Sequence, residues 1–319
     1  MTRKQKLVLG ADCGGTNLKL ALIEPSGAIL YSKRVPVNFT EAPQKVICGI
    51  GKEFKKFLKE SRVSEILGIG MGIAGDVDQQ KGIVRFSPNL NWKQVPLKQI
   101  LSKEFPYPLL IENDANCAAW GAYCLDAKKD CKNLICLTLG TGIGGGIILN
   151  GKLFRGSRGS AGEIGHMTIE YRGRPCKCGN FGCTESMIGA WGLIQTAQDG
   201  LKKGLAPILK KILSKSKGIE LNPETIEEAA AQGDGYCRQI WDEAGEILGC
   251  TLSNLVNLFN PDRIILCGGV SKARSWILKP ALHTLAMRAF KTPLVSLRVS
   301  ISQYDEKLGV VGAGLLFWE

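Results

Sequence analysis

The pattern that most constrains the fold is an apolar strand that runs into a glycine turn and then into a second strand. It occurs first at residues 7–23, where the turn at residues 12–17 separates two stretches with strand periodicity. It returns at residues 134–149, around a turn at residues 140–146. A repeat on this scale suggests two related halves that face each other, each of mixed α/β type.

Further segments follow the same alternation of helix and strand. We expect a helix through residues 46–58, a strand at 66–73, a long amphipathic helix at 236–259, a strand at 264–267 and a final apolar helix at 308–317. The run Asn260-Pro261-Asp262 should end the long helix. With 319 residues the chain should form two domains, so a site between domains is expected.

The formal net charge of +12 raises the question of a nucleic-acid or membrane partner. The lysines are scattered along the polar faces of expected helices, without interleaved aromatic residues, so we expect no nucleic-acid partner. Asp12 and Asn17 interrupt the first apolar stretch, and no run of about 18 apolar residues occurs. The sequence therefore predicts a cytoplasmic protein without a membrane partner.

Glycine turns at strand ends allow backbone amides to approach a phosphate closely. Residues 140–145 formally satisfy G-x-G-x-x-G, but a strand follows where a dinucleotide site requires a helix, so we exclude that site. Asp12 either caps a tight turn or organises Mg²⁺ through water. The expected ATP-binding residues are Asp12, Gly14, Gly15, Thr16, Gly140, Thr141, Gly142, Gly268 and Gly269.

Four metal-binding side chains crowd into one short segment with the spacing H-x9-C-x-C-x4-C. They are His166, Cys176, Cys178 and Cys183. One imidazole and three thiolates fill a closed tetrahedral zinc site, so the metal should be structural; a disulfide or chance clustering are the alternatives. Such a metal would hold the carboxylates of Glu163 and Glu185 in one neighbourhood.

A third cluster of polar residues follows the apolar strand that ends near Ile111. Glu112, Asn113, Asp114 and Asn116 come in quick succession, and small residues then begin a helix. Taken alone, Asn113-Asp114 is explained equally well as a helix N-cap and as part of a catalytic site.

Together these segments resemble the ROK family of sugar kinases, a branch of the hexokinase, actin and heat-shock ATPase superfamily. The similarity spans nearly the whole chain and rests on four motifs. They are D-x-G-G-T at residues 12–16, L-T-L-G-T-G-I-G-G-G at 137–146, A-G-E-I-G-H at 161–166 and C-K-C-G-N-F-G-C-T-E at 176–185. The resemblance implies a two-lobed actin/hexokinase-like ATPase fold of duplicated ribonuclease H-like domains. Residues 1–115 plus 303–319 would form a small N-terminal lobe, and residues 116–302 a large lobe with the zinc site and a dimerisation surface.

The resemblance also implies roles for individual residues. Asp114 matches the catalytic base, and the residues that match sugar contacts are Asn89, Asn113, Glu163, His166 and Glu185. His166 would bind zinc through one ring nitrogen and face the sugar with the other. The implied cofactors are ATP, Mg²⁺ and structural Zn²⁺, the implied substrate is a hexose, and the implied assembly is a homodimer or homotetramer.

The expected reaction is transfer of a phosphoryl group from ATP to the 6-hydroxyl of a hexose. Residues 113–116 and the loop at 88–92 look most like glucokinases of the family, although N-acetylmannosamine and other hexose or N-acetylhexosamine kinases share nearly all motifs. Residues 156–160 depart from the family's usual small-residue run, which leaves the environment of the sugar C2 open. An actin-like or chaperone ATPase would not need the Glu163 to Glu185 constellation.

A sugar-sensing transcriptional regulator is the alternative from another class, because the family also includes sugar-responsive repressors. Those proteins carry a helix-turn-helix segment before the first glycine turn, and only about ten residues precede Asp12 here. The sequence therefore favours the enzyme over a regulator that lacks its DNA-binding segment.

Overall fold

The computed structural model describes residues 6–63, 65–215 and 219–319. The strands are β1 (Val8–Cys13), β2 (Asn17–Ile23), β3 (Ile29–Pro36), β4 (Ile69–Ile73), β5 (Asp76–Asp78), β6 (Ile83–Ser87), β7 (Trp92–Val95), β8 (Leu109–Asn113), β9 (Leu134–Leu139), β10 (Ile143–Leu149), β11 (Lys152–Leu153), β12 (Arg263–Cys267) and β13 (Arg298–Ile301). The α-helices are α1 (Pro43–Ser61), α2 (Leu97–Glu104), α3 (Asp114–Leu125), α4 (Thr184–Ile188), α5 (Ala190–Lys202), α6 (Pro207–Ser214), α7 (Pro223–Ala231), α8 (Gly235–Phe259), α9 (Ser275–Arg288), α10 (Lys291–Leu294) and α11 (Leu308–Leu315). Short 3₁₀ turns are η1 (Ile164–His166), η2 (Gly269–Ala273), η3 (Asp305–Lys307) and η4 (Leu316–Trp318).

The first sheet has the strand order β3-β2-β1-β4-β8. Strands β1, β2 and β3 form the expected antiparallel meander. Strand β4 pairs parallel with β1, and β8 pairs parallel with β4. The first glycine turn joins β1 to β2 and is closed by a hydrogen bond from Gly14 N to Asn17 O of 3.1 Å. A third, smaller antiparallel sheet of β5, β6 and β7 was not expected from the sequence.

The second five-stranded sheet has the order β11-β10-β9-β12-β13 and repeats the arrangement of the first. Strands β10 and β11 are antiparallel, whereas β12 and β13 are parallel, as in the corresponding places of the first sheet. The second glycine turn lies between β9 and β10, with Gly140 N donating to Gly142 O at 2.9 Å. The matching strand orders support the expectation of two related halves.

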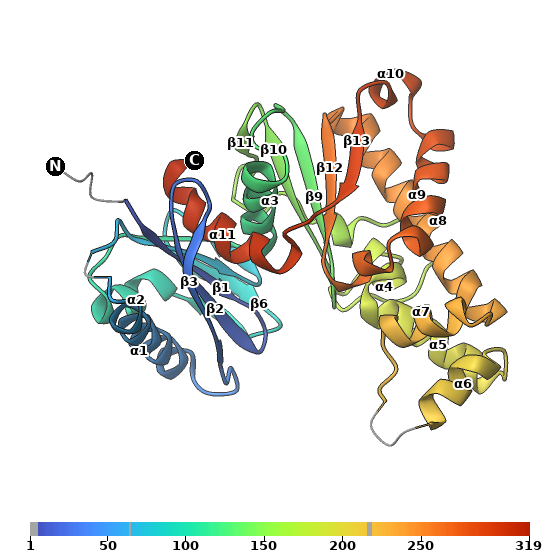
Figure 1. Cartoon of the computed structure of the whole chain (residues 1–319), viewed down its shortest axis with the longest axis horizontal. Coiled ribbons are helices and arrows are strands. Elements are labelled where there is room, and N and C mark those ends of the chain that lie inside the picture. The colour runs from blue at the N-terminus through green and yellow to red at the C-terminus, as the bar shows by residue number, and fades with distance from the viewer. Residues whose placement is uncertain (1–5, 64, 216–218) are drawn as a thin grey trace. The chain divides into compact units, whose positions relative to one another are not determined.

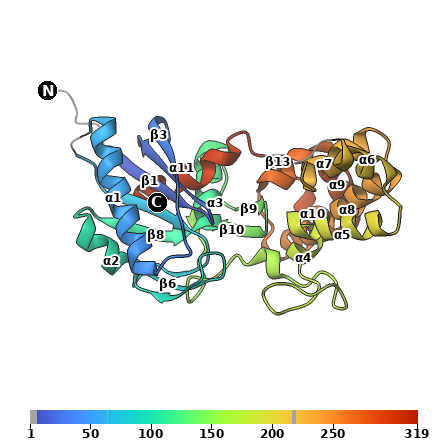
Figure 2. The ribbon, with the colours of Figure 1, turned by 90° about the horizontal axis from the view of Figure 1, so that it is seen from below.

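Helices cover both faces of the first sheet (Figures 1 and 2). Side chains of β1, β2 and β4 on one face share an apolar core with α1 and α2, in which Phe54 and Phe57 are fully buried. Helix α11 packs on the opposite face, and α3 packs against α11. Because successive strand residues point to opposite faces, Leu9 and Met71 belong to the first core while Gly10 and Gly70 face α11.

Glycine allows α11 to lie close to the sheet and to α3. A β-carbon at Gly10 would overlap the carbonyl oxygen of Val310, and one at Gly70 would overlap that of Ala313. On α11 itself, a β-carbon at Gly312 would overlap the carbonyl oxygen of Cys117 in α3. Helix packing, and not a turn or a ligand, therefore explains these glycines.

Gly312→Ala should lower the free energy of unfolding by about 1–3 kcal/mol, because the added methyl forces α11 and α3 apart. Gly49→Ala is the matched control: Gly49 is an exposed residue of α1 whose β-carbon would meet no atom within 4 Å. The control should stabilise the protein by roughly 0.5–1 kcal/mol. Urea unfolding of both variants checks this, and equal effects of the two would contradict the packing argument.

Helix α8 confirms the long helix expected at residues 236–259. Asp234 caps it by accepting hydrogen bonds from Tyr236 N at 3.1 Å and Cys237 N at 3.2 Å. The helix ends at Asn260, whose left-handed φ of 43° stops the helical path. Trp241 is fully buried, and α9 packs along α8.

The chain divides into two compact units. The first unit comprises residues 1–136, 146–162 and 303–319, and the second comprises residues 137–145 and 163–302. The boundary expected near residue 115 thus lies inside the first unit. The physical reason is that α3 packs on α11, where Trp120 Nε1 donates to Leu315 O at 3.0 Å.

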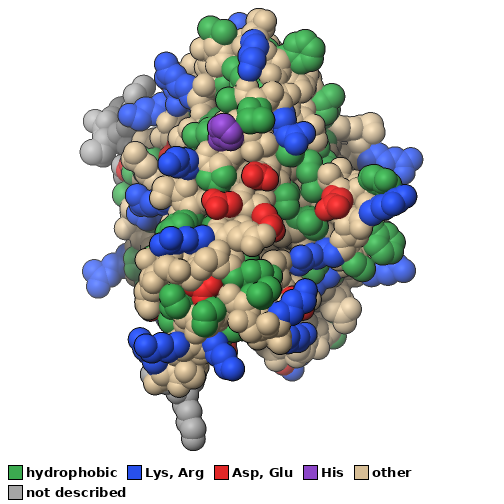
Figure 3. All heavy atoms as spheres, turned by 90° about the vertical axis from the view of Figure 1, so that its right-hand side faces the viewer, with side chains coloured by type: hydrophobic (Ala, Val, Ile, Leu, Met, Phe, Trp, Pro, Cys, Tyr) green, Lys and Arg blue, Asp and Glu red, His purple; other side chains and the backbone are tan. Residues whose placement is uncertain are grey.

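One face of the molecule carries its positive charge in a dispersed form (Figure 3). Lys and Arg side chains on the face in Figure 3 are spread among apolar and acidic ones and form no continuous stripe. Exposed apolar side chains occur on α8 and α9 and on either side of α10; they include Leu258, Met287, Phe290 and Val295. Among the described residues, no helix combines the length and apolar character that a membrane span requires.

Candidate active site

The junction between β8 and α3 holds the first group of expected site residues. Asn113 is the N-cap of α3: its Oδ1 accepts a hydrogen bond from Asn116 N at 3.0 Å, and its Nδ2 donates to Gly75 O at 3.1 Å. Asp114 is the first residue of the helix. The N-cap is therefore Asn113, and Asp114 Oδ1 accepts a hydrogen bond from the next residue's amide, Ala115 N, at 2.9 Å.

Asp12 lies at the end of β1, opposite Lys19 of β2. The first turn is closed by its backbone, and the Asp12 carboxylate instead pairs with Lys19, with Oδ2 and Nζ 3.6 Å apart. Burial raises the pKa of the Asp12 carboxyl, and the Lys19 ammonium opposes that rise. Burial, and then the charges of Asp12 and Asp114, raise the pKa of the Cys13 thiol. The carboxylates of Asp12 and Asp114 thus both influence the Cys13 thiol, near the carboxyl ends of β1 and β8.

Asn89 lies just after β6, in an exposed loop. Ser87, just before this loop, packs against Gly75: a β-carbon added at Gly75 would lie 2.8 Å from the β-carbon of Ser87. The φ of +129° at Gly75 also requires glycine. Because Gly75 O also accepts from Asn113 Nδ2, one glycine corner holds both segments. Ser87, two residues before Asn89, therefore lies at the same corner as Asn113.

The glycines of the three expected phosphate turns fall into two groups. A β-carbon would meet no atom closer than 3.8 Å at Gly14, Gly15, Gly140 or Gly269, and none of these residues has a positive φ. By contrast, the Glu185 carboxylate occupies the place that a β-carbon at Gly142 would take. Gly268 has a φ of +94°, and a β-carbon there would lie only 2.5 Å from Leu139 O. Neither packing nor backbone strain accounts for the first group. Their surroundings leave open space beside the backbone, as a phosphate-binding turn would require.

Glu185 joins the second glycine turn to the cysteine cluster within the second unit. Its Oε2 accepts a hydrogen bond from Ile143 N at 2.9 Å, and its Oε1 lies 4.0 Å from Cys176 Sγ. Thr141 is exposed at the tip of the turn. Glu185 itself lies in the first turn of α4, directly after the cluster.

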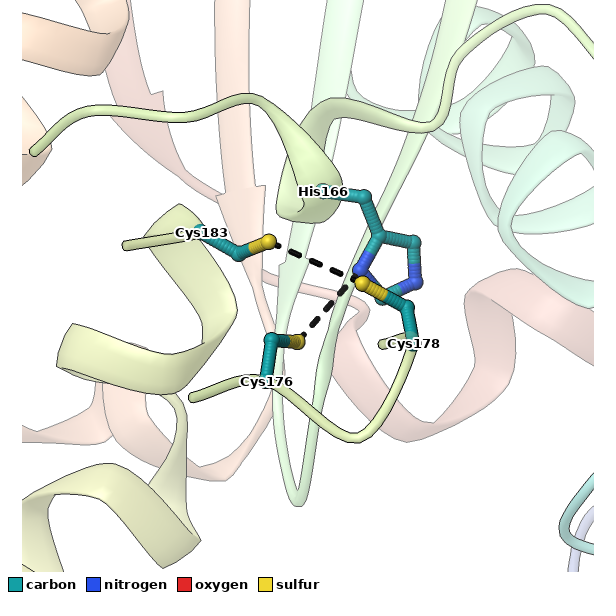
Figure 4. A group of neighbouring side chains, drawn as sticks. All are labelled: His166, Cys176, Cys178 and Cys183. Carbon is teal, nitrogen blue, oxygen red and sulfur yellow. Dashed lines mark hydrogen bonds between the residues drawn. The ribbon is translucent and has the colours of Figure 1, made fainter. Parts of the chain in front are cut away.

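The four expected metal ligands converge (Figure 4). Their donor atoms all lie within 4.8 Å of one another, with His166 Nδ1 3.8 Å from Cys176 Sγ and Cys178 Sγ 3.7 Å from Cys183 Sγ. Tetrahedral zinc, with bonds of about 2.0–2.3 Å, sets its ligand atoms about 3.6–3.8 Å apart. The separation between His166 and Cys176 and that between Cys178 and Cys183 match this spacing, and the three cysteines are free thiols rather than a disulfide.

The loop around the cluster is shaped by its glycines and backbone bonds. Gly179 and Gly182 adopt positive φ values of 94° and 63°, and Cys176 N donates to Asn180 O at 2.8 Å. His166 turns its other nitrogen, Nε2, toward Glu163, whose Oε2 is 4.0 Å away. The two ring nitrogens thus face different groups, Nδ1 the cysteines and Nε2 the Glu163 carboxylate.

Two residues of the first unit were given no role by sequence reasoning. Glu112 is buried in β8 beside the cap residue Asn113, and Arg155 forms an ion pair with it at 2.7 Å. An acidic residue within an apolar strand could have marked Glu112 as a residue with a buried partner. Nothing local marks Arg155 as its partner.

Comparison with known proteins shows which family this chain belongs to. Residues 8–319 match the ROK family. The chain belongs to the ROK family. Its fold is accordingly the two-lobed actin/hexokinase-like ATPase fold, as the sequence indicated.

ROK proteins similar to this chain include enzymes and a regulator. A glucokinase of Halalkalibacterium halodurans is 33% identical over 97% of this chain and 94% of its own. A xylose repressor of Caldicellulosiruptor bescii is 31% identical over 96% of this chain and 76% of its own. A ROK family glucokinase of Streptomyces griseus, solved with glucose and AMPPNP, is 32% identical with a TM-score of 0.82, covering 97% of this chain and 98% of that one.

Proposed function

We propose that this chain is an ATP-dependent hexose kinase that phosphorylates the 6-hydroxyl of glucose. The observation that carries the proposal is the carboxylate of Asp114 at the start of α3, in the same unit as a glycine turn with room for phosphates. The similarity to a glucokinase solved with glucose and AMPPNP supports both substrates.

In the proposed reaction, Asp114 accepts the proton of the sugar 6-hydroxyl as that oxygen attacks the γ-phosphorus in line. The bond from the γ-phosphorus to the β,γ-bridging oxygen breaks, and ADP leaves with that oxygen. Further polar side chains bind the remaining hydroxyls, because each one left unpaired on burial would weaken binding. These side chains are Asn89, Asn113, Glu163, His166 and Glu185. Backbone amides of the glycine turns hold the phosphates.

Metal ions fit two places in this scheme. Asp12 would hold Mg²⁺ through water, and that ion supplies positive charge against the phosphate oxygens. His166, Cys176, Cys178 and Cys183 would hold structural zinc, which fixes the orientation of the imidazole. Glu163, whose Oε2 lies 4.0 Å from His166 Nε2, would bind the sugar beside that imidazole.

Two alternatives remain distinct from this proposal. A kinase for N-acetylmannosamine or another hexose would use the same residues on a different substrate. A sugar-sensing regulator is favoured by the 31% identity to a xylose repressor, and it would bind a sugar without transferring phosphate.

A coupled assay for ADP with five sugars tests the substrate. Glucose, mannose, fructose, N-acetylglucosamine and N-acetylmannosamine are compared at equal concentration, with ATP and Mg²⁺ in excess. We expect glucose to give the highest kcat/KM. A higher value for another sugar would move the proposal to that substrate, and ADP release that is independent of sugar would point to a plain ATPase.

Gly15→Ala should raise the KM for ATP by about tenfold with no loss of stability. The added methyl meets no protein atom within 4 Å, so it obstructs only a ligand. Steady-state kinetics with varied ATP and with varied glucose, together with thermal unfolding, check this. Unfolding at a lower temperature with an unchanged KM for ATP would mean that the turn serves the fold alone.

A further inference from the structure

A buried carboxylate supports the junction that carries Asp114. Glu112 has only 1% of its surface exposed, and its Oε1 accepts hydrogen bonds from Asn113 N at 2.9 Å and Asn116 Nδ2 at 3.0 Å. These donors lie on either side of Asp114. Glu112 therefore fixes the path of the chain through the junction from inside the first unit.

The same carboxylate is held by two groups from distant parts of the first unit. Arg155 Nε donates to Glu112 Oε2 at 2.7 Å, and Gln79 Nε2 donates to Glu112 Oε1 at 2.8 Å. Gln79 Nε2 also lies 3.3 Å from Gly159 O. These groups line a cavity of about 1030 Å³, in which residues 155–160 form one wall. Glu112 thus connects the Asp114 junction with the segment at residues 155–160.

Residues 158 and 160 of that segment have an anchor of their own. Arg85 pairs with Asp76 at 2.6 Å and donates to Arg158 O at 2.7 Å, while Ser160 Oγ donates to Asp76 Oδ1 at 2.6 Å. The chain then passes through Gly162, whose φ is +95°, directly to Glu163. The segment is therefore tied at both ends just before a proposed sugar-binding residue.

Arg155 is itself held by two carboxylates, those of Glu112 and Glu319. Burial lowers the pKa of the Arg155 guanidinium, but the carboxylates of Glu319 and Glu112 outweigh that effect and hold the pKa above its usual value. Arg155 Nη1 donates to Glu319 Oε1 at 2.9 Å, so the guanidinium bridges two acids. Removing one member of a buried pair leaves the other charge without compensation, and the surrounding backbone must move.

We propose that Glu112 and Arg155 are positioning residues that hold the Asn113–Asp114 junction and the segment leading to Glu163 in one rigid frame for the sugar. The proposal rests on the proposed hexose kinase activity. It adds that the sugar-binding geometry, and not the nucleotide-binding geometry, depends on this pair. Neither residue needs to touch substrate.

Arg155→Met tests the pair because it removes the charge and keeps much of the aliphatic stem. We expect the KM for the sugar to rise about tenfold and kcat to fall about tenfold, since small displacements of aligned groups have effects of this size or greater. The KM for ATP should stay within about twofold. Arg155→Lys should recover part of the loss, because it restores a charge beside Glu112.

Glu319→Gln is the matched control. It removes the other carboxylate partner of Arg155 but leaves the contact with Glu112 and the Asp114 junction in place. We expect both KM values and kcat within about twofold of the wild type. Arg155→Met with unchanged sugar KM and kcat, or with equal increases in both KM values, would overturn the positioning role.

Two further measurements keep the test decisive. Should Arg155→Met fail to fold, the double variant Glu112→Gln/Arg155→Met leaves no uncompensated buried charge and should show the same kinetic loss. Amide hydrogen exchange over residues 113–122 and 155–163 needs no substrate. Faster exchange in both peptides of Arg155→Met supports the frame even if the wild type phosphorylates no sugar, whereas unchanged exchange in either peptide contradicts it.

Discussion

Asp114→Asn should lower kcat by about 10³-fold while the dissociation constant for the sugar changes by less than about threefold. The substitution preserves shape, and the helix cap at Asn113 stays intact, so the site should keep its structure. The amide cannot accept the hydroxyl proton, so only the chemical step suffers. Steady-state kinetics give kcat, and calorimetry with the sugar alone gives the dissociation constant.

The control for this substitution is Asp199→Asn, which alters an exposed acid of α5 that pairs with Lys202. It should leave kcat within about twofold of the wild type. If Asp114→Asn kept its kcat within about tenfold, another group would have to be the base. A large loss of sugar affinity would instead make Asp114 a binding residue.

Cys183→Ser should remove bound zinc, lower the unfolding temperature and raise the KM for the sugar. Cys183 is fully buried and supplies one of four converging ligand atoms. Zinc binding energies of about 10–16 kcal/mol in small zinc-dependent peptides indicate a loss of several kcal/mol in this larger protein. Zinc content by mass spectrometry, thermal unfolding and sugar kinetics are the measurements.

Cys48→Ser is the control, because Cys48 lies in α1 of the first unit and belongs to no described metal cluster. It should retain zinc at the wild-type level. Zinc-depleted wild type that stays folded should also lose sugar affinity, because His166 would no longer be oriented. An unchanged sugar KM in such protein would refute the positioning role of the metal, and full zinc retention by Cys183→Ser would refute the ligand set.

The metal cluster and the helix junction were readable from the sequence because their residues are local. Eighteen residues contain all four proposed zinc ligands, and the spacing alone indicated that they meet. Asn113 and Asp114 were recognised together, but the sequence explained them equally well as a helix N-cap and as part of a catalytic site. The hydrogen bond from Asn116 N makes Asn113 the cap of α3, and the catalytic role of Asp114 stays a prediction.

The roles of individual glycines were the hardest feature to predict from the sequence. Gly15 and Gly70 look alike in the sequence, yet the first has open space and the second lies against α11, some 240 residues further along the chain. The pair of Glu112 and Arg155 was hidden for the same reason, since 43 positions separate them. Long-range packing sets these contacts, and no local pattern encodes it. The short strands β5, β6 and β7 were missed because three to five residues give little periodicity.

The most direct test of the central claim is phosphorus NMR of purified protein incubated with ATP, Mg²⁺ and glucose. We expect glucose 6-phosphate and ADP to appear in equal amounts, with neither formed when sugar is omitted. Glucose binding without any phosphorylated sugar or ADP would contradict the account and favour a sugar-sensing role.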